Sequence, residues 1–316
     1  MIARLRALES RGHSRSIGIG LAAVTALVSG ISVFVNASAV RAFTDPVLFT
    51  TLKNGVAAVI LVTVALAVVD RAPARLRGLG PRSLGGLAVI GVIGGGIPFV
   101  LFFTGLANAS APAAALIHKT LFVWVALLAA ILLRERLGGL QVAALAVLVV
   151  AQLLILPADG LAWTAGEWMI AAATGMWAVE VIVAKRLLRD VPSPIATAAR
   201  MGIGLVLLLG YVSIRGGLAG VGALGMEQWA WVLVTGGLLS VYVASWYAAL
   251  RRAPASAVTA ILTLGAPITA ALQLVAHGQV PAPAALAGHG AVLAAGVLIG
   301  WLALRPRASA ASTAAA

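Results

Sequence analysis

The sequence predicts an all-α integral membrane protein whose ten transmembrane helices form two inverted five-helix repeats. Three observations predict this fold: the composition, the spacing of the apolar runs and the placement of the basic residues. Of the 316 residues, 62% are hydrophobic and 10% are charged, and the mean hydropathy is +1.07. A soluble domain carries about a quarter charged residues. Most of the surface must therefore face lipid.

The apolar runs have the length of membrane spans. A helix of about 20 residues crosses the hydrocarbon core of a bilayer. Turn-forming segments such as Asp45-Pro46 separate the runs. The predicted spans are 17–40, 47–69, 84–106, 111–133, 137–156, 166–188, 194–215, 228–250, 254–275 and 283–304.

The basic residues alternate between the two sides of these spans. With a cytoplasmic N-terminus, the outside segments contain only Arg41 and Arg215 of the 22 Lys and Arg residues. Three others, Lys53, Lys119 and Arg200, fall within spans. This is the positive-inside distribution, and it predicts that both termini are cytoplasmic. The net charge of +13 then reflects topology and does not indicate a nucleic-acid partner.

A weak internal repeat divides the chain into two halves. One shift along the sequence pairs Lys53 with Arg200, and a slightly smaller shift aligns 105–109 with 249–253. Each half contains five spans. Because five is odd, the second copy must cross the membrane in the opposite sense. Inverted repeats of this kind build many secondary transporters, with the substrate held at the midplane between them.

The repeats define the predicted domain organisation. The first five-helix repeat covers 17–156 and the second covers 166–304. Short basic cytoplasmic tails at 1–16 and 305–316 flank them. The chain contains no cysteine, which excludes disulfides and cysteine-ligated metals.

Several short segments resemble a known family. They are Asp45-Pro46 with Lys53, Gly105-Leu106-Ala107, Ala113-Ala114-Ala115, Leu133-Arg134-Glu135-Arg136-Leu137 with Gln141, Trp177, Pro194 with Arg200, Ala249-Leu250, Ala257-Val258 and Gly265-Ala266-Pro267. With them the chain resembles the drug/metabolite transporter superfamily, specifically bacterial EamA-type transporters with two EamA domains. The resemblance implies a multi-pass protein of the bacterial cell (inner) membrane that moves small solutes. It also implies a central cavity lined mainly by spans 1, 3, 4, 6, 8 and 9.

The two halves also differ at positions within these segments. Val123 stands where the second repeat has Pro267, and Gln279 stands where the first repeat has Glu135. Both differences argue against symmetric gating.

Charged side chains within the spans are the first candidates for a site, because burying a charge in lipid is costly. Lys119 lies near the midplane and has no charged counterpart in the second repeat, where Thr263 aligns with it. It either recognises substrate or is a structural partner for a carboxylate or carbonyls. Glu180 either couples protons, binds a substrate amine, or pairs structurally with Lys119 or Lys185. Trp177 shares the face of Glu180.

Lys53 and Arg200 lie closer to the membrane surfaces, where long basic side chains can extend to water. Their symmetric placement predicts a structural or gating role. His118 precedes Lys119 and is either a pH-sensing group or a hydrogen-bonded core residue.

Two further patterns suggest parts of a cavity. Glycines at Gly94, Gly95 and Gly96 followed by Pro98 can kink the third span so that its backbone lines a cavity, or they can allow close helix packing. In the eighth span, Thr235, Tyr242 and Trp246 share one helical face, which either lines a pocket or packs against a neighbouring helix.

These features predict a secondary transporter that exports small organic metabolites, such as amino acids, by alternating access at a midplane cavity. The sequence contains no catalytic motif and no nucleotide-binding loop. The excess of cations within the spans predicts a substrate carboxylate near Lys119. The alternative is an intramembrane enzyme or lipid-handling protein that uses Lys119, His118 and Glu180.

The predicted partners are a small-molecule substrate and the lipid bilayer, without cofactor, metal or nucleic acid. The sequence leaves open protons as the coupling ion and assembly as a homodimer.

Overall fold

The computed structural model describes residues 2–156 and 163–305, and the ordered elements in these ranges are all helices. The all-α membrane fold predicted from the sequence is confirmed. Nine helical stretches in the described chain are long and apolar enough to cross a membrane. The remaining predicted span, the fifth, is α8 (Gly139–Ile155), whose 17 residues make it shorter than the others.

The helices follow the predicted order of spans. The first half contains α1 (Ile2–Ala39), α2 (Pro46–Val68), α4 (Pro81–Ile90), α5 (Ile97–Leu106), α6 (Ala111–Lys119), α7 (Leu121–Leu132) and α8. The second half contains α9 (Ala165–Leu187), α10 (Ser193–Ile214), α11 (Met226–Arg252), α12 (Ala255–Leu262), α13 (Gly265–His277) and α14 (Pro283–Leu304). The remaining short elements are η1 (Val40–Ala42), α3 (Ala72–Arg77), η2 (Gly91–Gly96) and η3 (Gly217–Ala223).

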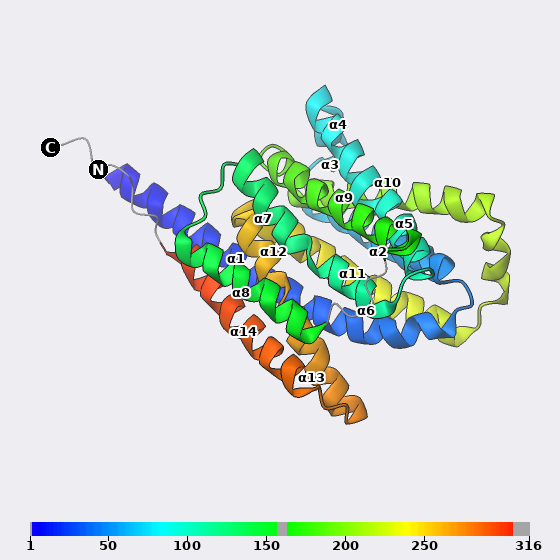
Figure 1. The fold of residues 1–316 in the computed structure, drawn as a ribbon. Helices are drawn as coiled ribbons and strands as arrows, with labels where there is room; N and C mark the ends of the chain where they lie inside the picture. The colour runs from blue at the N-terminus through cyan, green and yellow to red at the C-terminus, as the bar shows by residue number, and fades with distance from the viewer. Residues whose placement is uncertain (1, 157–162, 306–316) are drawn as a thin grey trace.

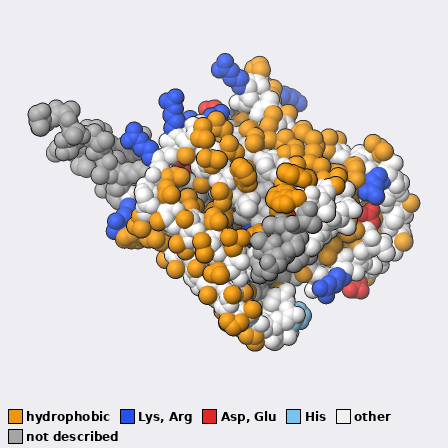
Figure 2. All heavy atoms as spheres, in the orientation of Figure 1, with side chains coloured by type: hydrophobic (Ala, Val, Ile, Leu, Met, Phe, Trp, Pro, Cys, Tyr) orange, Lys and Arg blue, Asp and Glu red, His pale blue; other side chains and the backbone are white. Residues whose placement is uncertain are grey.

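The surface of the molecule is largely apolar, as contact with lipid requires. Figure 2 shows hydrophobic side chains across the middle of the visible face and charged side chains toward its edges. Large side chains such as Leu66, Ile131 and Val206 point outward from the helices that carry them. In water such a surface would aggregate, so it is best explained as the face that contacts the bilayer.

The helix contacts follow the pseudo-twofold relation expected of inverted repeats. Span 1 (α1) packs along span 8 (α11), and the equivalent pair, span 6 (α9) with span 3 (α4, η2 and α5), also packs. Span 2 packs on span 7, and span 5 packs on span 10. The pseudo-twofold axis exchanges the two members of each of these pairs, so each pair corresponds to itself. The first half therefore interlocks with the second rather than folding beside it.

The first helix and the last helix meet at one end of the bundle, which we call the terminal end (Figure 1). Arg15 Nη1 donates to the Ala303 carbonyl across 3.4 Å at this end. The opposite end is called the far end. Helix α1 begins at Ile2 and continues into the first span, so the described part of the predicted tail over 1–16 is helical.

The fourth and ninth spans, predicted as continuous helices, are each broken in two. The fourth breaks at Thr120 between α6 and α7, and the ninth breaks at Thr263 between α12 and α13. In both breaks the threonine hydroxyl donates to the carbonyl three residues earlier, at 2.7 Å for Thr120 and 2.6 Å for Thr263. Such interrupted helices leave backbone groups free, and membrane transporters use them at their binding sites.

The third span is also irregular, because Gly91–Gly96 form a π-helical turn between α4 and α5. At Gly95 an added Cβ would lie 2.1 Å from the Arg200 carbonyl oxygen and 3.1 Å from Gly204 Cα. Helix α10 thus crosses the span in near backbone contact. The π-helical turn matches the kink predicted in the third span. The glycines of this turn allow the close approach of α10.

Candidate functional site

A cavity of about 450 Å³ lies between the two halves of the bundle. Its volume suits a small organic solute. It is lined by the six spans that the family resemblance implied, with Arg200 added from span 7. The lining residues are Ser29, Val33, Phe99, Phe102, Phe103, Ala115, His118, Lys119, Leu121, Phe122, Trp177, Glu180, Val181, Arg200, Leu239, Tyr242, Val243, Trp246, Thr259, Leu262 and Thr263.

The residues beside the cavity are buried to different degrees at the two ends of the bundle. On the terminal side, Leu188, Leu250 and Val258 are completely or almost completely buried. On the far side, Val33 lines the cavity and is 52% exposed.

Lys119 lies at the C-terminal end of α6, beside the break in the fourth span, and its side chain lines the cavity. In the described part of the chain it forms no hydrogen bond and no ion pair. A cation in this position costs about 2.5–3.5 kcal/mol on insertion scales. The protein leaves this charge for water or a ligand to stabilise.

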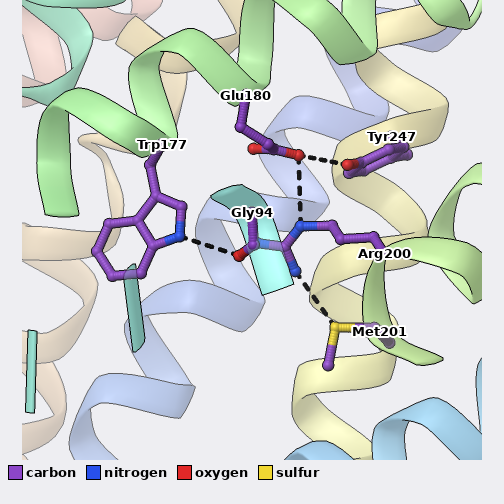
Figure 3. A network of polar contacts seen from close by, with 6 residues as sticks. All are labelled: Gly94, Trp177, Glu180, Arg200, Met201 and Tyr247. Carbon is purple, nitrogen blue, oxygen red and sulfur yellow. Dashed lines mark hydrogen bonds and ion pairs between the residues drawn. The ribbon is translucent and has the colours of Figure 1, made fainter. Parts of the chain in front are cut away.

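Glu180 and Arg200 form the second charged group of the cavity. Arg200 Nε lies 3.3 Å from Glu180 Oε1, and both side chains are almost completely buried. The Tyr247 hydroxyl donates to the same carboxylate oxygen (Figure 3). Because opposite charges cancel here, the lining of the cavity retains one net positive charge, that of Lys119.

Arg200 and Trp177 are both anchored on the π-helical turn. The Gly94 carbonyl accepts hydrogen bonds from Arg200 Nη2 at 2.9 Å and from Trp177 Nε1 at 3.1 Å (Figure 3). Arg200 Nη1 also approaches Met201 Sδ at 3.2 Å. A π-helical turn frees carbonyls from the helix ladder, which explains how one carbonyl can hold two side chains.

An aromatic wall faces the charged groups. Trp177 meets Phe99 edge-on with ring centroids 5.5 Å apart, and meets His118 at 5.1 Å. Phe102 lies 5.6 Å from Trp177 and 5.2 Å from His118. On the other side, Tyr242 and Trp246 stack nearly parallel, and both rings line the cavity. The cavity thus combines an apolar aromatic surface with a single uncompensated cation.

The structure brings together the six residues predicted to bind substrate: Lys119, His118, Glu180, Trp177, Tyr242 and Trp246 all line this cavity. The predicted structural partner of Glu180 is wrong, because the carboxylate pairs with Arg200 and not with Lys119 or Lys185. Lys185 instead donates to backbone carbonyls at the terminal end.

The residues predicted to gate or support the site divide into three groups. Arg200 does not extend to the membrane surface but turns into the cavity. Lys53 lies outside the cavity lining, where it donates to Asn36 Oδ1 at 3.1 Å and lies over the Phe49 ring. The segment Gly94–Gly96 and Pro98 are not among the lining residues, which favours the close-packing alternative for these glycines.

Sequence reasoning missed Tyr247 and the phenylalanines of the aromatic wall. Tyr247 directly follows Trp246, so its side chain points about 100° away from the helical face that Thr235, Tyr242 and Trp246 share. Phe99 and Phe102 lie in a span where almost every residue is apolar, and no sequence signal separates a cavity face from a lipid face there. Among the described residues, no cluster of three or more His, Asp or Glu side chains could hold a metal.

Two interlocked repeats with a solute-sized cavity between them define a membrane transporter fold. Residues 16–156 and 164–301 each match the EamA-like transporter family. The chain belongs to this family, and it is a multi-pass membrane protein.

A curated relative is the "Probable terminal-alkyne amino-acid exporter" of Streptantibioticus cattleyicolor (strain ATCC 35852 / DSM 46488 / JCM 4925 / NBRC 14057 / NRRL 8057). It is 30% identical over 239 residues, which are 75% of this chain and 79% of the relative. A crystal structure described only as "Crystal structure of protein" has the same fold, with a TM-score of 0.70 and 19% identity. The alignment covers 91% of this chain and 99% of that one.

Proposed function

We propose that this protein exports small amino acids with apolar side chains, as a secondary transporter that works by alternating access. The observation that carries the proposal is Lys119, a cation without a partner in the described chain, in a cavity that is otherwise aromatic and charge-balanced. A substrate carboxylate would supply the missing negative charge. The relative named as an amino-acid exporter supports the same class of solute.

The aromatic wall supports the apolar part of the substrate. Trp177, Phe99 and Phe102 offer ring faces and edges a short distance from Lys119, within one cavity. An aliphatic or unsaturated side chain would gain free energy from this contact. The ammonium group would face Tyr242 and Trp246, whose rings attract cations. A zwitterion with a short apolar side chain would place its carboxylate at Lys119, its side chain on the aromatic wall and its ammonium group at Tyr242 and Trp246.

The basic residues support a cytoplasmic position for the terminal end. Arg71, Arg75 and Arg77 lie at or in α3, which follows α2 at this end, and Arg251 and Arg252 close α11 there. By the positive-inside rule this end faces the cytoplasm, and both termini with it. The open far end then faces outward from the bacterial cell membrane, which fits the release step of an exporter.

The alternative of an intramembrane enzyme or lipid-handling protein has less support. Lys119, His118 and Glu180 share the cavity, but the carboxylate is held by Arg200 and Tyr247. His118 contacts the Phe102 and Trp177 rings, and its Nδ1 is buried without a hydrogen-bond partner among the described residues. Neither arrangement aligns a base with a nucleophile. Repeat limits of 17–156 and 166–304, proton coupling through Glu180 and a homodimer remain predictions.

A transport assay on two related solutes tests the proposal. Purified protein in liposomes should move L-norvaline, and should move its decarboxylated analogue butylamine at least about tenfold more slowly, because a charged hydrogen-bonded contact is lost. Empty liposomes and liposomes with an unrelated membrane protein serve as controls. Equal movement of norvaline and butylamine would overturn the carboxylate assignment.

A further inference from the structure

At the terminal end, a carboxylate from the first half of the chain accepts hydrogen bonds from the second half. Glu135 lies in the segment between α7 and α8. Its Oε1 accepts a hydrogen bond from Ala255 N at 2.7 Å, and its Oε2 accepts from Ser256 N at 3.2 Å and Ser256 Oγ at 2.6 Å. The amides of Ala255 and Ser256 are the first two of α12, which is the half of the broken ninth span at the terminal end.

Helix α12 depends on this contact because its own sequence provides no cap. Pro254 precedes it and offers no side-chain hydrogen bond. The first amides of a helix need an acceptor, and the helix dipole favours a negative charge at that point. Glu135 supplies both from another repeat. Arg134 adopts a left-handed backbone (φ 54°), and the Glu135 amide donates to the Ala129 carbonyl at 3.0 Å, which orients the side chain toward α12.

Two basic side chains close the same end with complementary contacts. Lys185, near the end of α9, donates to the carbonyls of Leu250, in the last turn of α11, and Ala253, the residue that caps it. Arg186 Nη2 donates to the Leu132 carbonyl, the last of α7, at 2.6 Å. Cations at helix C-termini are stabilising for the same electrostatic reason. The turn between α11 and α12 is thus held from both sides, directly beneath the closed floor of the cavity.

The far end lacks the equivalent contact. Gln279 occupies the position that corresponds to Glu135 in the second repeat, but its side chain is exposed and forms no hydrogen bond with the described residues. Helix α6, which corresponds to α12, is capped by its own Ser110, whose hydroxyl accepts from Ala113 N at 3.3 Å. The two ends of an otherwise symmetric bundle therefore differ in how they close.

We propose that Glu135 is a gate residue whose contacts with Ala255 and Ser256 must break each time the terminal end opens. This inference rests on the proposed transport function, and it also fits the burial of Leu250 and Val258 at the terminal end. With a charged contact at one end and none at the other, the closed terminal end is favoured. Solute loading from the cytoplasm then has to release Glu135 from α12.

Cysteine accessibility tests the gate without any solute. The chain has no native cysteine, so single reporters can be placed at Val258, buried below the cavity floor, and at Phe103, which lines the open far half. The full chain in nanodiscs is labelled with a water-soluble maleimide. With Glu135→Gln, labelling of Val258→Cys should rise about tenfold and labelling of Phe103→Cys should fall, as losing a hydrogen bond to a charge predicts.

Matched variants separate gating from damage. Ser256→Ala, which keeps both amides, should have a smaller effect of the same sign. Glu227→Gln changes an exposed carboxylate at the far end and should change neither reporter. Unchanged labelling of Val258→Cys in Glu135→Gln would overturn the proposal, as would a rise at Val258 without a fall at Phe103, which indicates local fraying. Because no solute is used, failure of amino-acid transport alone would leave these outcomes intact.

Discussion

The two cations of the cavity are treated very differently by the protein. Arg200, from the second half, is enclosed by Glu180, the Gly94 carbonyl and Met201, all within hydrogen-bonding or ion-pairing distance. Lys119, from the first half, has no such partner in the described chain, although it lies in the same cavity. One charge is neutralised by the fold, and the other has no counter-charge among the described residues.

Under the proposed function, Arg200 in the second half supports the structure, and Lys119 in the first half binds substrate. A buried ion pair stabilises little in net terms, but removing one partner leaves the other charge uncompensated. An unpartnered cation costs free energy in the empty protein and returns it when an anion binds. The predictions below separate these two roles, beginning with the largest expected effect.

Replacing Arg200 should damage the fold far more than replacing Lys119. In Arg200→Met, Glu180 is left buried without a cation, which costs about 3–5 kcal/mol of unfolding free energy. Lys119→Met keeps an unbranched chain, removes an uncompensated charge and should leave stability unchanged or raised. Heat-induced unfolding of the purified variants measures both. Adding Glu180→Gln to Arg200→Met should recover part of the loss, because the buried group is then neutral.

The close approach of α10 that places Arg200 should be the next most sensitive feature. Gly95→Ala would put a methyl group 2.1 Å from the Arg200 carbonyl oxygen, and overpacking of this kind costs about 1–3 kcal/mol. Gly202→Ala, on α10 itself, is the control, since nothing lies within 4 Å of its added Cβ. Equal thermal stability of the two variants would show that α10 can move away without cost.

An effect of similar size should distinguish two tyrosines of α11. Tyr247→Phe removes the hydroxyl that donates to Glu180, which should cost about 1–3 kcal/mol because the carboxylate is buried. The Tyr242 hydroxyl makes no hydrogen bond to a described residue, so Tyr242→Phe should leave unfolding nearly unchanged. The same melting assay compares them. If Tyr242→Phe is the more damaging variant, the network has been assigned to the wrong ring.

The position of Lys119 within a span and its lack of a charged counterpart could both be predicted from the sequence. The length of the apolar runs places Lys119 well inside a span, and the repeat alignment shows that it has no charged counterpart. Both observations depend only on position along the chain. The cavity-lining residues Trp177, Tyr242 and Trp246 followed from helical periodicity in the same way.

The ion pair between Arg200 and Glu180 could not be predicted, because it depends on how the helices are rotated about their axes and how closely they approach one another. Glu180 is within reach of several cations when only span positions are known. Its choice of Arg200 follows from the contact of α10 with the π-helical turn at Gly95. The break at Thr120 was equally hidden. Gly265 and Pro267 signal the corresponding break in the second half, but the first half has Val123 and no glycine or proline beside its break.

Direct binding of a carboxylate ligand tests the central claim, which is that Lys119 is reserved for substrate. Radiolabelled L-norvaline is measured by equilibrium dialysis against the parent protein, Lys119→Met and the control Lys53→Met, whose amine is satisfied by Asn36 outside the cavity. We expect Lys119→Met to raise Kd at least about tenfold, while Lys53→Met stays within about twofold. Pentanoate should compete for the parent protein and butylamine should not. If Lys119→Met binds norvaline as tightly as the parent, the lysine has a structural role and the account is wrong.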